Sequence, residues 1–256
     1  MSARLPEIIA HRGASHEAPE NTLSAFRLAW QQRADACECD VQLTQDGHVV
    51  IMHDADTIRT TGVKGLVRGR ILPELRELEV GAWKARRWTG EKIPTLAAAL
   101  AILPAGRRMF IEIKSGPETV PTLAETLRRS LVTPEQTAII GFSLEVMMLA
   151  KRALPKVQVY WGVETKPSRS GRVWPVPTDD LIAQTRRSGL DGLDLDASGP
   201  IDSDFVARVH AARLKLYVWT VNTAPLARRL TTAGVDGITT DRPAWLHEQV
   251  RAARGR

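Results

Sequence analysis

The chain has 256 residues, 43% of them hydrophobic and 25% charged, and this composition excludes a disordered or fibrous protein. No apolar run approaches the roughly 20 residues that span a bilayer, and no signal-peptide core is evident, so we expect a cytoplasmic protein without stable membrane anchoring. The formal net charge is +6, but Lys and Arg are scattered and form no basic stripe interleaved with aromatic residues, which argues against a nucleic-acid partner.

Short apolar runs alternate with amphipathic segments along most of the chain. The predicted strands are residues 7–13, 37–44, 48–54, 110–114, 138–142, 157–164, 192–196, 216–222 and 237–241. The predicted helices include residues 21–32, 94–103, 118–131, 143–154, 202–212 and 224–234. Alternation of this kind over about 250 residues favours an α/β fold of the (β/α)8 TIM-barrel type, with a doubly wound open sheet as the alternative.

The second and third predicted strands are joined by a short Asp-Gly segment, which indicates a β-hairpin within the otherwise parallel scheme. If Gln45 pairs with His48 across a two-residue turn, Asp40 lies opposite His53 with both side chains on one face. This register would bring a carboxylate and an imidazole together.

Residues 55–93 lose the alternation of strands and helices. We interpret them as a small insertion after the second and third strands, placed over the mouth of the barrel. The chain 1–256 is then one domain that contains this insertion.

Two acidic residues share one face of the second predicted strand. Glu38 and Asp40 are two residues apart, so they point the same way while Cys37 and Cys39 point to the other face. Adjacent carboxylates with oxygen-only ligands favour a hard cation such as Mg²⁺ or Ca²⁺, and the outward thiols argue against zinc. The alternative is an exposed strand whose acids are simply hydrated.

Chemically active side chains gather at the C-terminal ends of the predicted strands, where βα barrels build their active sites. They are His11, Arg12, Glu38, Asp40, His53, Glu112, Lys114, Trp219 and Asn222. The set offers three carboxylates for one cation, two imidazoles for proton transfer and two cationic side chains for an anion. This inventory suits phosphate-ester hydrolysis.

The ordered motifs resemble those of the glycerophosphodiester phosphodiesterase family, whose members share the phospholipase C-like phosphodiesterase barrel. The matching segments are AHRGASHEAPENTLSAF (residues 10–26), CECDVQLTQDGHVVIMHD (37–54), IEIK (111–114), VWTVN (218–222) and GVDGITTDRP (234–243). A three-residue HRG would be weak support, but the whole set occurs in the order found in the family.

The resemblance implies metal-dependent hydrolysis of glycerophosphodiesters to sn-glycerol 3-phosphate and an alcohol, within lipid and glycerol metabolism. By similarity, the metal ligands are Glu38, Asp40 and Glu112, the acid/base pair is His11 and His53, and the substrate-binding residues are Arg12, Lys114, Trp219 and Asn21. The cofactor would be one divalent cation, Mg²⁺ or Ca²⁺ with Mn²⁺ also possible. The head-group alcohol, the assignment of acid and base, and the oligomeric state stay open.

The sequence departs from the family pattern at Cys37 and Cys39, which flank Glu38, and at Gly141, Phe142 and Ser143. The nucleophile is either the glycerol 2-hydroxyl, which would form a cyclic phosphate that water then opens, or water itself. Two rival functions are a lysophospholipase D-like or sphingomyelinase D-like phosphodiesterase, and a non-catalytic barrel that binds glycerophosphodiesters. The apolar groove of a lipid enzyme could come from tryptophans 83, 88, 161 and 174.

Overall fold

The strands form one sheet in the computed structural model, which describes residues 5–164 and 178–254. They are β1 (Glu7–Ala10), β2 (Ala36–Leu43), β3 (Val49–Ile51), β4 (Arg108–Ile113), β5 (Thr137–Gly141), β6 (Gln158–Val163), β7 (Gly192–Asp196), β8 (Lys215–Trp219) and β9 (Gly237–Thr240). The order is β1-β9-β8-β7-β6-β5-β4-β2-β3, and an additional β1–β2 pairing closes the ring. All pairs are parallel except β2–β3.

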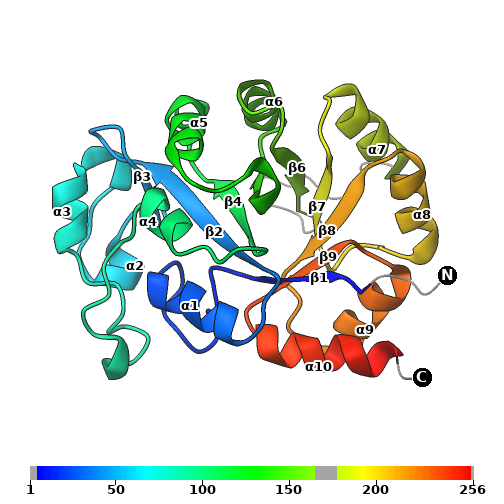
Figure 1. The fold of residues 1–256 in the computed structure, drawn as a ribbon, viewed down its shortest axis with the longest axis horizontal. Coiled ribbons are helices and arrows are strands. Elements are labelled where there is room, and N and C mark those ends of the chain that lie inside the picture. Colours follow the sequence, from blue (N-terminus) through cyan, green and yellow to red (C-terminus); the bar gives the residue numbers. More distant parts are fainter. Residues whose placement is uncertain (1–4, 165–177, 255–256) are drawn as a thin grey trace.

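The predicted barrel is therefore confirmed, and the open-sheet alternative is wrong. Eight parallel strands surround the axis, while β3 pairs with the C-terminal part of β2. Helices surround the strands (Figure 1). They are α1 (Leu23–Gln31), α4 (Leu96–Ala101), α5 (Thr119–Arg129), α6 (Leu144–Ala153), α7 (Thr178–Arg187), α8 (Ser203–Ala211), α9 (Ala224–Ala233) and α10 (Pro243–Arg254). Among the described residues, no helix is long and apolar enough to cross a membrane.

Helix starts follow local capping chemistry. The hydroxyls of Thr22, Thr95 and Ser143 accept hydrogen bonds from backbone N–H groups in the first turns of α1, α4 and α6, and these bonds satisfy donors that the helix itself leaves unpaired. Apolar side chains from the outer faces of the strands then pack against the helices. A separate aromatic cluster that includes Phe110, Tyr160 and Tyr217 fills the barrel interior.

The hairpin of β2 and β3 has a different register from the predicted one. Leu43 pairs with Val49, so Asp40 lies opposite Met52 rather than His53. The loop is one residue longer than expected: Thr44 pairs with His48, and Gly47 adopts a φ of +79° that closes the turn. His53 follows the end of β3 and is not positioned by strand register.

Residues 55–93, which we call the lobe, lie beside β3 and contain α2 (Ile58–Thr61) and α3 (Leu72–Glu77) (Figure 1). The lobe has a small apolar core that includes Val67, Leu75 and Ile93 and that also takes in side chains of the hairpin. It contacts the loop after β1, where Lys84 Nζ donates to Ser15 O at 2.7 Å and Trp88 Nε1 donates to Glu17 O at 3.2 Å.

Candidate active site

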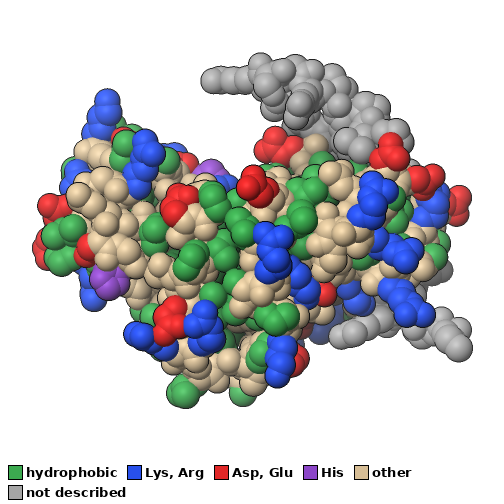
Figure 2. Space-filling view, turned by 90° about the horizontal axis from the view of Figure 1, so that it is seen from above, with side chains coloured by type: hydrophobic (Ala, Val, Ile, Leu, Met, Phe, Trp, Pro, Cys, Tyr) green, Lys and Arg blue, Asp and Glu red, His purple; other side chains and the backbone are tan. Residues whose placement is uncertain are grey.

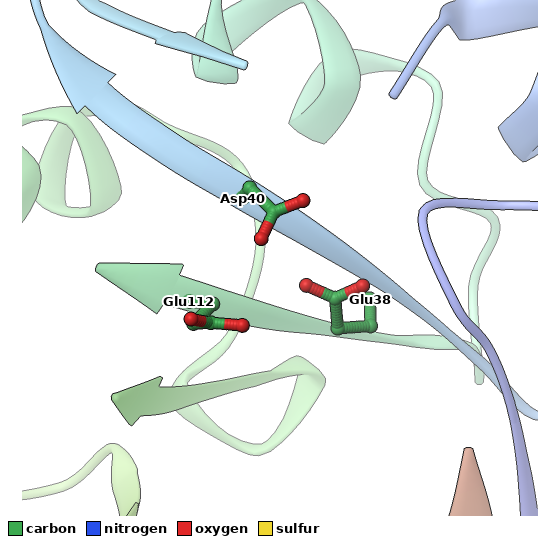
Figure 3. Close-up of side chains that lie close together, drawn as sticks. All are labelled: Glu38, Asp40 and Glu112. Atoms are coloured by element: carbon green, nitrogen blue, oxygen red, sulfur yellow. The ribbon is translucent and has the colours of Figure 1, made fainter. Parts of the chain in front are cut away.

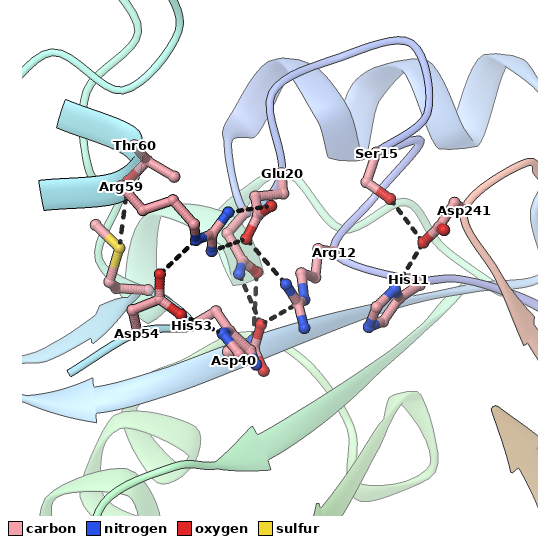
Figure 4. A network of polar contacts seen from close by, with 12 residues as sticks. His11, Arg12, Ser15, Glu20, Asp40, His53, Asp54, Arg59, Thr60 and Asp241 are labelled. Carbon is pink, nitrogen blue, oxygen red and sulfur yellow. Dashed lines mark hydrogen bonds and ion pairs between the residues drawn. The ribbon is translucent and has the colours of Figure 1, made fainter. Parts of the chain in front are cut away.

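The first strand delivers two side chains through a tight turn. His11 extends the β1 ladder, because its backbone N–H donates to Thr240 O at 2.8 Å. Arg12 and Gly13 then adopt φ values of +55° and +80° and reverse the chain. A side chain at Gly13 would meet the backbone of Ala25 at 2.6 Å, so this position requires glycine. His11 and Arg12 consequently point into the site at the C-terminal end of the barrel (Figure 4).

Three carboxylates converge from two neighbouring strands (Figure 3). Glu38 and Asp40 lie on the inner face of β2, and strand register places Glu112 of β4 beside Asp40. One oxygen from each of the three lies within 4.8 Å of the others. Glu38 Oε1 and Asp40 Oδ1 are buried and lack any hydrogen-bond partner. Buried acceptors without donors are costly unless a cation satisfies them.

The three carboxylates and the cationic side chains beside them shift one another's pKa values. Burial, together with the charges of Asp40 and Glu112, raises the pKa of Glu38 well above its usual range. Burial and Asp40 likewise raise the pKa of Glu112. Burial also acts to raise the pKa of Asp40, but Arg12 and Lys114 outweigh it and lower that pKa. Asp40 is thus the carboxylate most firmly held in the charged form.

Two cationic side chains and an amide border the carboxylates. Arg12 Nε lies 3.0 Å from Asp40 Oδ2, and Lys114 Nζ lies 2.7 Å from Glu112 Oε1 and 3.6 Å from Asp40 Oδ1. Asn21, held at a φ of +59°, donates its Nδ2–H to Asp40 Oδ2 at 2.8 Å. Asn21 therefore fixes the position of the Asp40 carboxylate.

His11 is held by an aspartate from the opposite end of the chain. Its Nδ1 lies 2.6 Å from Asp241 Oδ1, and the same carboxylate accepts hydrogen bonds from Ser15 Oγ at 3.1 Å and Asn222 Nδ2 at 2.6 Å. Burial acts to raise the pKa of Asp241, but the hydrogen bonds from His11, Asn222 and Ser15 lower it to about 2. Asp241 is therefore an ionised partner that orients the His11 ring.

His53 forms a second histidine–aspartate pair. Its Nδ1 lies 2.7 Å from Asp54 Oδ1. The buried amide of Gln42, on the inner face of β2, donates to Met52 O at 3.0 Å and to Asp54 O at 2.5 Å. Burial lowers the pKa of His53. Gln42 thus anchors the backbone that carries His53, which strand register alone does not place.

The aromatic residues divide between the site and the barrel exterior. Trp219 ends β8, donates Nε1–H to Asp194 O at 3.1 Å and makes an edge-on contact with Phe142, which is 41% exposed. Trp161 Nε1 donates to Phe142 O, whereas Trp83 and Trp88 lie in the lobe. Trp174 is outside the described residues.

The remaining histidines lie outside this cluster. His16 and His48 are exposed on turns, His210 pairs with Asp236, and His247 contacts the carbonyl of Arg33. On the face shown in Figure 2, Lys and Arg side chains are interspersed with Asp and Glu and form no continuous basic patch.

Comparison with known proteins identifies the family. The model of the glycerophosphoryl diester phosphodiesterase family matches residues 11–245. The chain belongs to this family. It is 33% identical over 245 residues to a putative glycerophosphodiester phosphodiesterase of Bacillus subtilis, covering 93% of this chain and 96% of that protein. It is also 33% identical over 250 residues to a glycerophosphodiester phosphodiesterase of Caldanaerobacter subterraneus, covering 95% and 97%.

Solved phosphodiesterase structures share the fold. A phosphodiesterase of Oleispira antarctica, solved in complex with the product sn-glycerol-3-phosphate, superposes with a TM-score of 0.85 and 30% identity. The match covers 96% of this chain and 97% of that one. The family identification from the sequence motifs is therefore confirmed, as is the assignment of the chain as a phosphodiesterase.

Sequence reasoning gave no role to three residues of this phosphodiesterase site: Gln42, Asp54 and Asp241. Asp54 directly follows His53, and Asp241 directly follows β9 within the GVDGITTDRP motif. Their places next to other motif residues were therefore the available signal in the sequence. Gln42 continues the alternation of Glu38 and Asp40 on the inner face of β2. That alternation could have placed Gln42 in the site, but only the structure shows what its amide holds.

Proposed function

We propose that this chain hydrolyses glycerophosphodiesters to sn-glycerol 3-phosphate and an alcohol, with a divalent cation and two histidines as the acid/base pair. The observation that carries the proposal is the cluster of three carboxylates with two buried oxygens that lack donors. Two oriented histidines lie at the same end of the barrel. Membership of the family makes a glycerophosphodiester the substrate class to test first.

Glu38, Asp40 and Glu112 would hold the cation, Mg²⁺, Ca²⁺ or Mn²⁺. All their ligand atoms are carboxylate oxygens, the donor type that these hard cations prefer. When bound, the cation would supply positive charge to a phosphoryl oxygen. The buried oxygens of Glu38 and Asp40 that accept no hydrogen bond are the features of this chain that fit such a cation.

Arg12 and Lys114 would bind the phosphate. Each already contacts a carboxylate of the cluster, so an anion beside these carboxylates would be flanked by a guanidinium and an ammonium group. Preorganised positive charge stabilises the additional negative charge of a phosphoryl transition state. Trp219 would line the same pocket.

His11 and His53 would exchange protons with the reacting oxygens. Each ring uses Nδ1 to contact an aspartate, and this contact leaves Nε2 for proton transfer. One histidine would accept the proton of the attacking hydroxyl while the other protonates the departing alcohol, with the roles reversed in a second step. We favour the glycerol 2-hydroxyl as nucleophile, which would give a cyclic glycerol phosphate, over direct attack by water.

The test is release of glycerol 3-phosphate from glycerophosphocholine by purified protein treated with EDTA, before and after Mg²⁺, Ca²⁺ or Mn²⁺ is restored. We expect release that depends on a metal and a transient cyclic phosphate visible by ³¹P NMR. Lysophosphatidylcholine tests the lysophospholipase D alternative in parallel, with release of choline as the readout because the acyl chain stays on the glycerol phosphate. Metal-dependent hydrolysis of neither substrate would contradict the proposal and favour a binding protein.

A further inference from the structure

The guanidinium group of Arg59, in the lobe, contacts the carboxylates that hold His53 and Arg12 (Figure 4). Arg59 lies on α2, outside the barrel, and its Nε donates to Asp54 Oδ2. Its Nη1 and Nη2 donate to Glu20 Oε2 at 2.9 Å and Glu20 Oε1 at 2.7 Å. Arg59 itself contacts none of the three carboxylates of the metal cluster, and neither histidine ring, in the described part of the chain.

The first branch leads to His53. Asp54 uses Oδ1 for the His53 ring and Oδ2 for Arg59, so the two partners together fix the plane of the carboxylate. Without the guanidinium, the Asp54 side chain could rotate and carry the imidazole away from its orientation. Histidine orientation by a carboxylate depends on such outer contacts.

The second branch leads to Arg12. Glu20 Oε1 accepts from both Arg59 Nη2 and Arg12 Nη1, the latter at 3.0 Å. A carboxylate held in a two-bond fork by one arginine presents a fixed acceptor to the other. Glu20 is thus a rigid anchor for the guanidinium that borders Asp40.

We propose that Arg59 is a positioning residue for the reaction, acting on His53 through Asp54 and on Arg12 through Glu20. This inference rests on the proposed function, because it gives His53 and Arg12 their chemical roles. It assigns to the lobe a part in catalysis: a four-residue helix of the lobe sets the orientation of a proton-transfer group and a phosphate-binding group together.

The docking of the lobe has other supports. Lys84 and Trp88 bond to the loop after β1, and the lobe has its own apolar core that includes Val67, Leu75 and Ile93. Arg59 is 41% exposed and belongs to neither set of contacts. Its removal should therefore loosen the two carboxylates without releasing the lobe.

The first experiment compares Arg59→Ala with Arg70→Ala. Arg70 lies in the same lobe, and within residues 5–164 and 178–254 its side chain donates a hydrogen bond only to the carbonyl of Lys64, so it is a matched control. We expect Arg59→Ala to lower kcat/KM by about 10- to 100-fold, the usual cost of losing an orienting contact, with circular dichroism and Tm close to those of Arg70→Ala. Guanidinium ion added to Arg59→Ala should restore part of kcat. The kcat/KM of Arg59→Lys should lie between those of wild type and Arg59→Ala, because an ammonium group cannot form the two parallel hydrogen bonds of a guanidinium group.

The second experiment removes Arg59 in a background that already carries Asp54→Asn and Glu20→Gln. If Arg59 acts through these carboxylates, Arg59→Ala should cost less than threefold in that background, a strong departure from additivity. An equal loss of activity in both backgrounds, or no response to guanidinium, would overturn the inference.

The two proposals fail in different ways. Wild-type protein that releases no glycerol 3-phosphate, or a His53→Ala variant with normal turnover, contradicts the proposed function itself. A wild-type enzyme that depends on His53 but is indifferent to Arg59→Ala contradicts only the role of Arg59.

Discussion

The two ends of the barrel interior both hold charged side chains, but they differ in how many of the charged atoms have hydrogen-bond partners. At the N-terminal end, Arg108 donates to Glu7 at 2.7 Å and to Gln158 at 2.7 Å, and Tyr160 and Tyr217 complete the network. At the C-terminal end, Glu38 and Asp40 keep buried oxygens without a donor. Among the described residues, no side-chain atom of the N-terminal network is left in that state.

The same contrast between the two ends is found within a single strand, β4. Arg108 and Glu112 both lie on β4 and point into the barrel, four residues apart. The charge at the start of the strand is neutralised by protein partners, whereas the charge near its end is only partly neutralised by Lys114. Barrels of this type place chemistry at the C-terminal end and stability at the other. Substitutions at the C-terminal end should therefore lower activity more than stability, and substitutions at the N-terminal end should lower stability more than activity.

The largest effect should come from the histidines at the C-terminal end. We expect His11→Ala or His53→Ala to lower kcat by two or more orders of magnitude, because each variant loses one proton transfer. Metal affinity and Tm should change little, because neither ring is a proposed ligand. Steady-state kinetics and calorimetric metal titration would measure this, and near-normal turnover by either variant contradicts the two-histidine scheme.

Arg108→Met should show the reverse behaviour at the N-terminal end. The change leaves the partly buried Glu7 without its cationic partner. Breaking a fully buried pair costs about 3–5 kcal/mol of unfolding free energy, so we expect a loss of about 3 kcal/mol or less here. Activity at a temperature where the variant is folded should remain close to wild type. Urea unfolding and kinetics on the same preparation check both; a stable but inactive variant would contradict the separation of the two ends.

Glu38→Gln tests whether the unpartnered carboxylates weaken the metal-free fold. Replacing the Glu38 carboxylate by a neutral amide should raise the unfolding free energy in EDTA by about 1–3 kcal/mol, because it removes the repulsion with Asp40 and Glu112 and the cost of burying a charge. The same change should abolish the rise in Tm that a bound cation gives the wild type. Lower stability in EDTA would show that Glu38 is satisfied without a cation.

The smallest expected effect is a pH dependence at the N-terminal end. Asp236 accepts from Lys215 Nζ at 2.6 Å, His210 Nε2 at 2.8 Å and the backbone of Leu216 at 2.9 Å. Burial acts to raise the pKa of Asp236, but these contacts lower it. A carboxylate whose pKa is lower in the folded protein than in the unfolded chain stabilises the fold at pH values above its ordinary pKa, near 3.9. This stabilisation is lost as the pH falls through the folded-state pKa.

Asp236→Asn should therefore remove about 1 kcal/mol or less at pH 5 and flatten the acid limb of the stability curve. Urea unfolding between pH 2.5 and about 5.5 measures the slope. An unchanged slope would mean that the Asp236 contacts do not persist in solution.

Sequence periodicity was sufficient for the barrel and for part of the site. Alternation on β2 put Glu38 and Asp40 on one face, and the ends of parallel strands then placed Glu112 and Lys114 beside them. The predicted hairpin of β2 and β3 is present, but its register differs from the predicted one because the turn, with Gly47 at positive φ, is one residue longer than an Asp-Gly pair indicates.

Contacts between distant segments could not be predicted. The bond of Arg59 to Glu20 joins residues 39 apart, and its partners are set by how the lobe packs. The lobe has neither a period of 2 nor a period of 3.6 to indicate which of its many basic side chains faces the barrel. Its arginines are equivalent in the sequence, and only their surroundings distinguish Arg59.

The bond between His11 and Asp241 spans 230 residues and joins the segments that follow the first and last barrel strands. A nascent chain emerging from the ribosome would carry His11, His53 and all three carboxylates long before it carries Asp241. With the proposed role of His11, we expect full activity to require the last strand, when β9 joins β1 and closes the ring. Recovery of activity during refolding would then report the moment of closure.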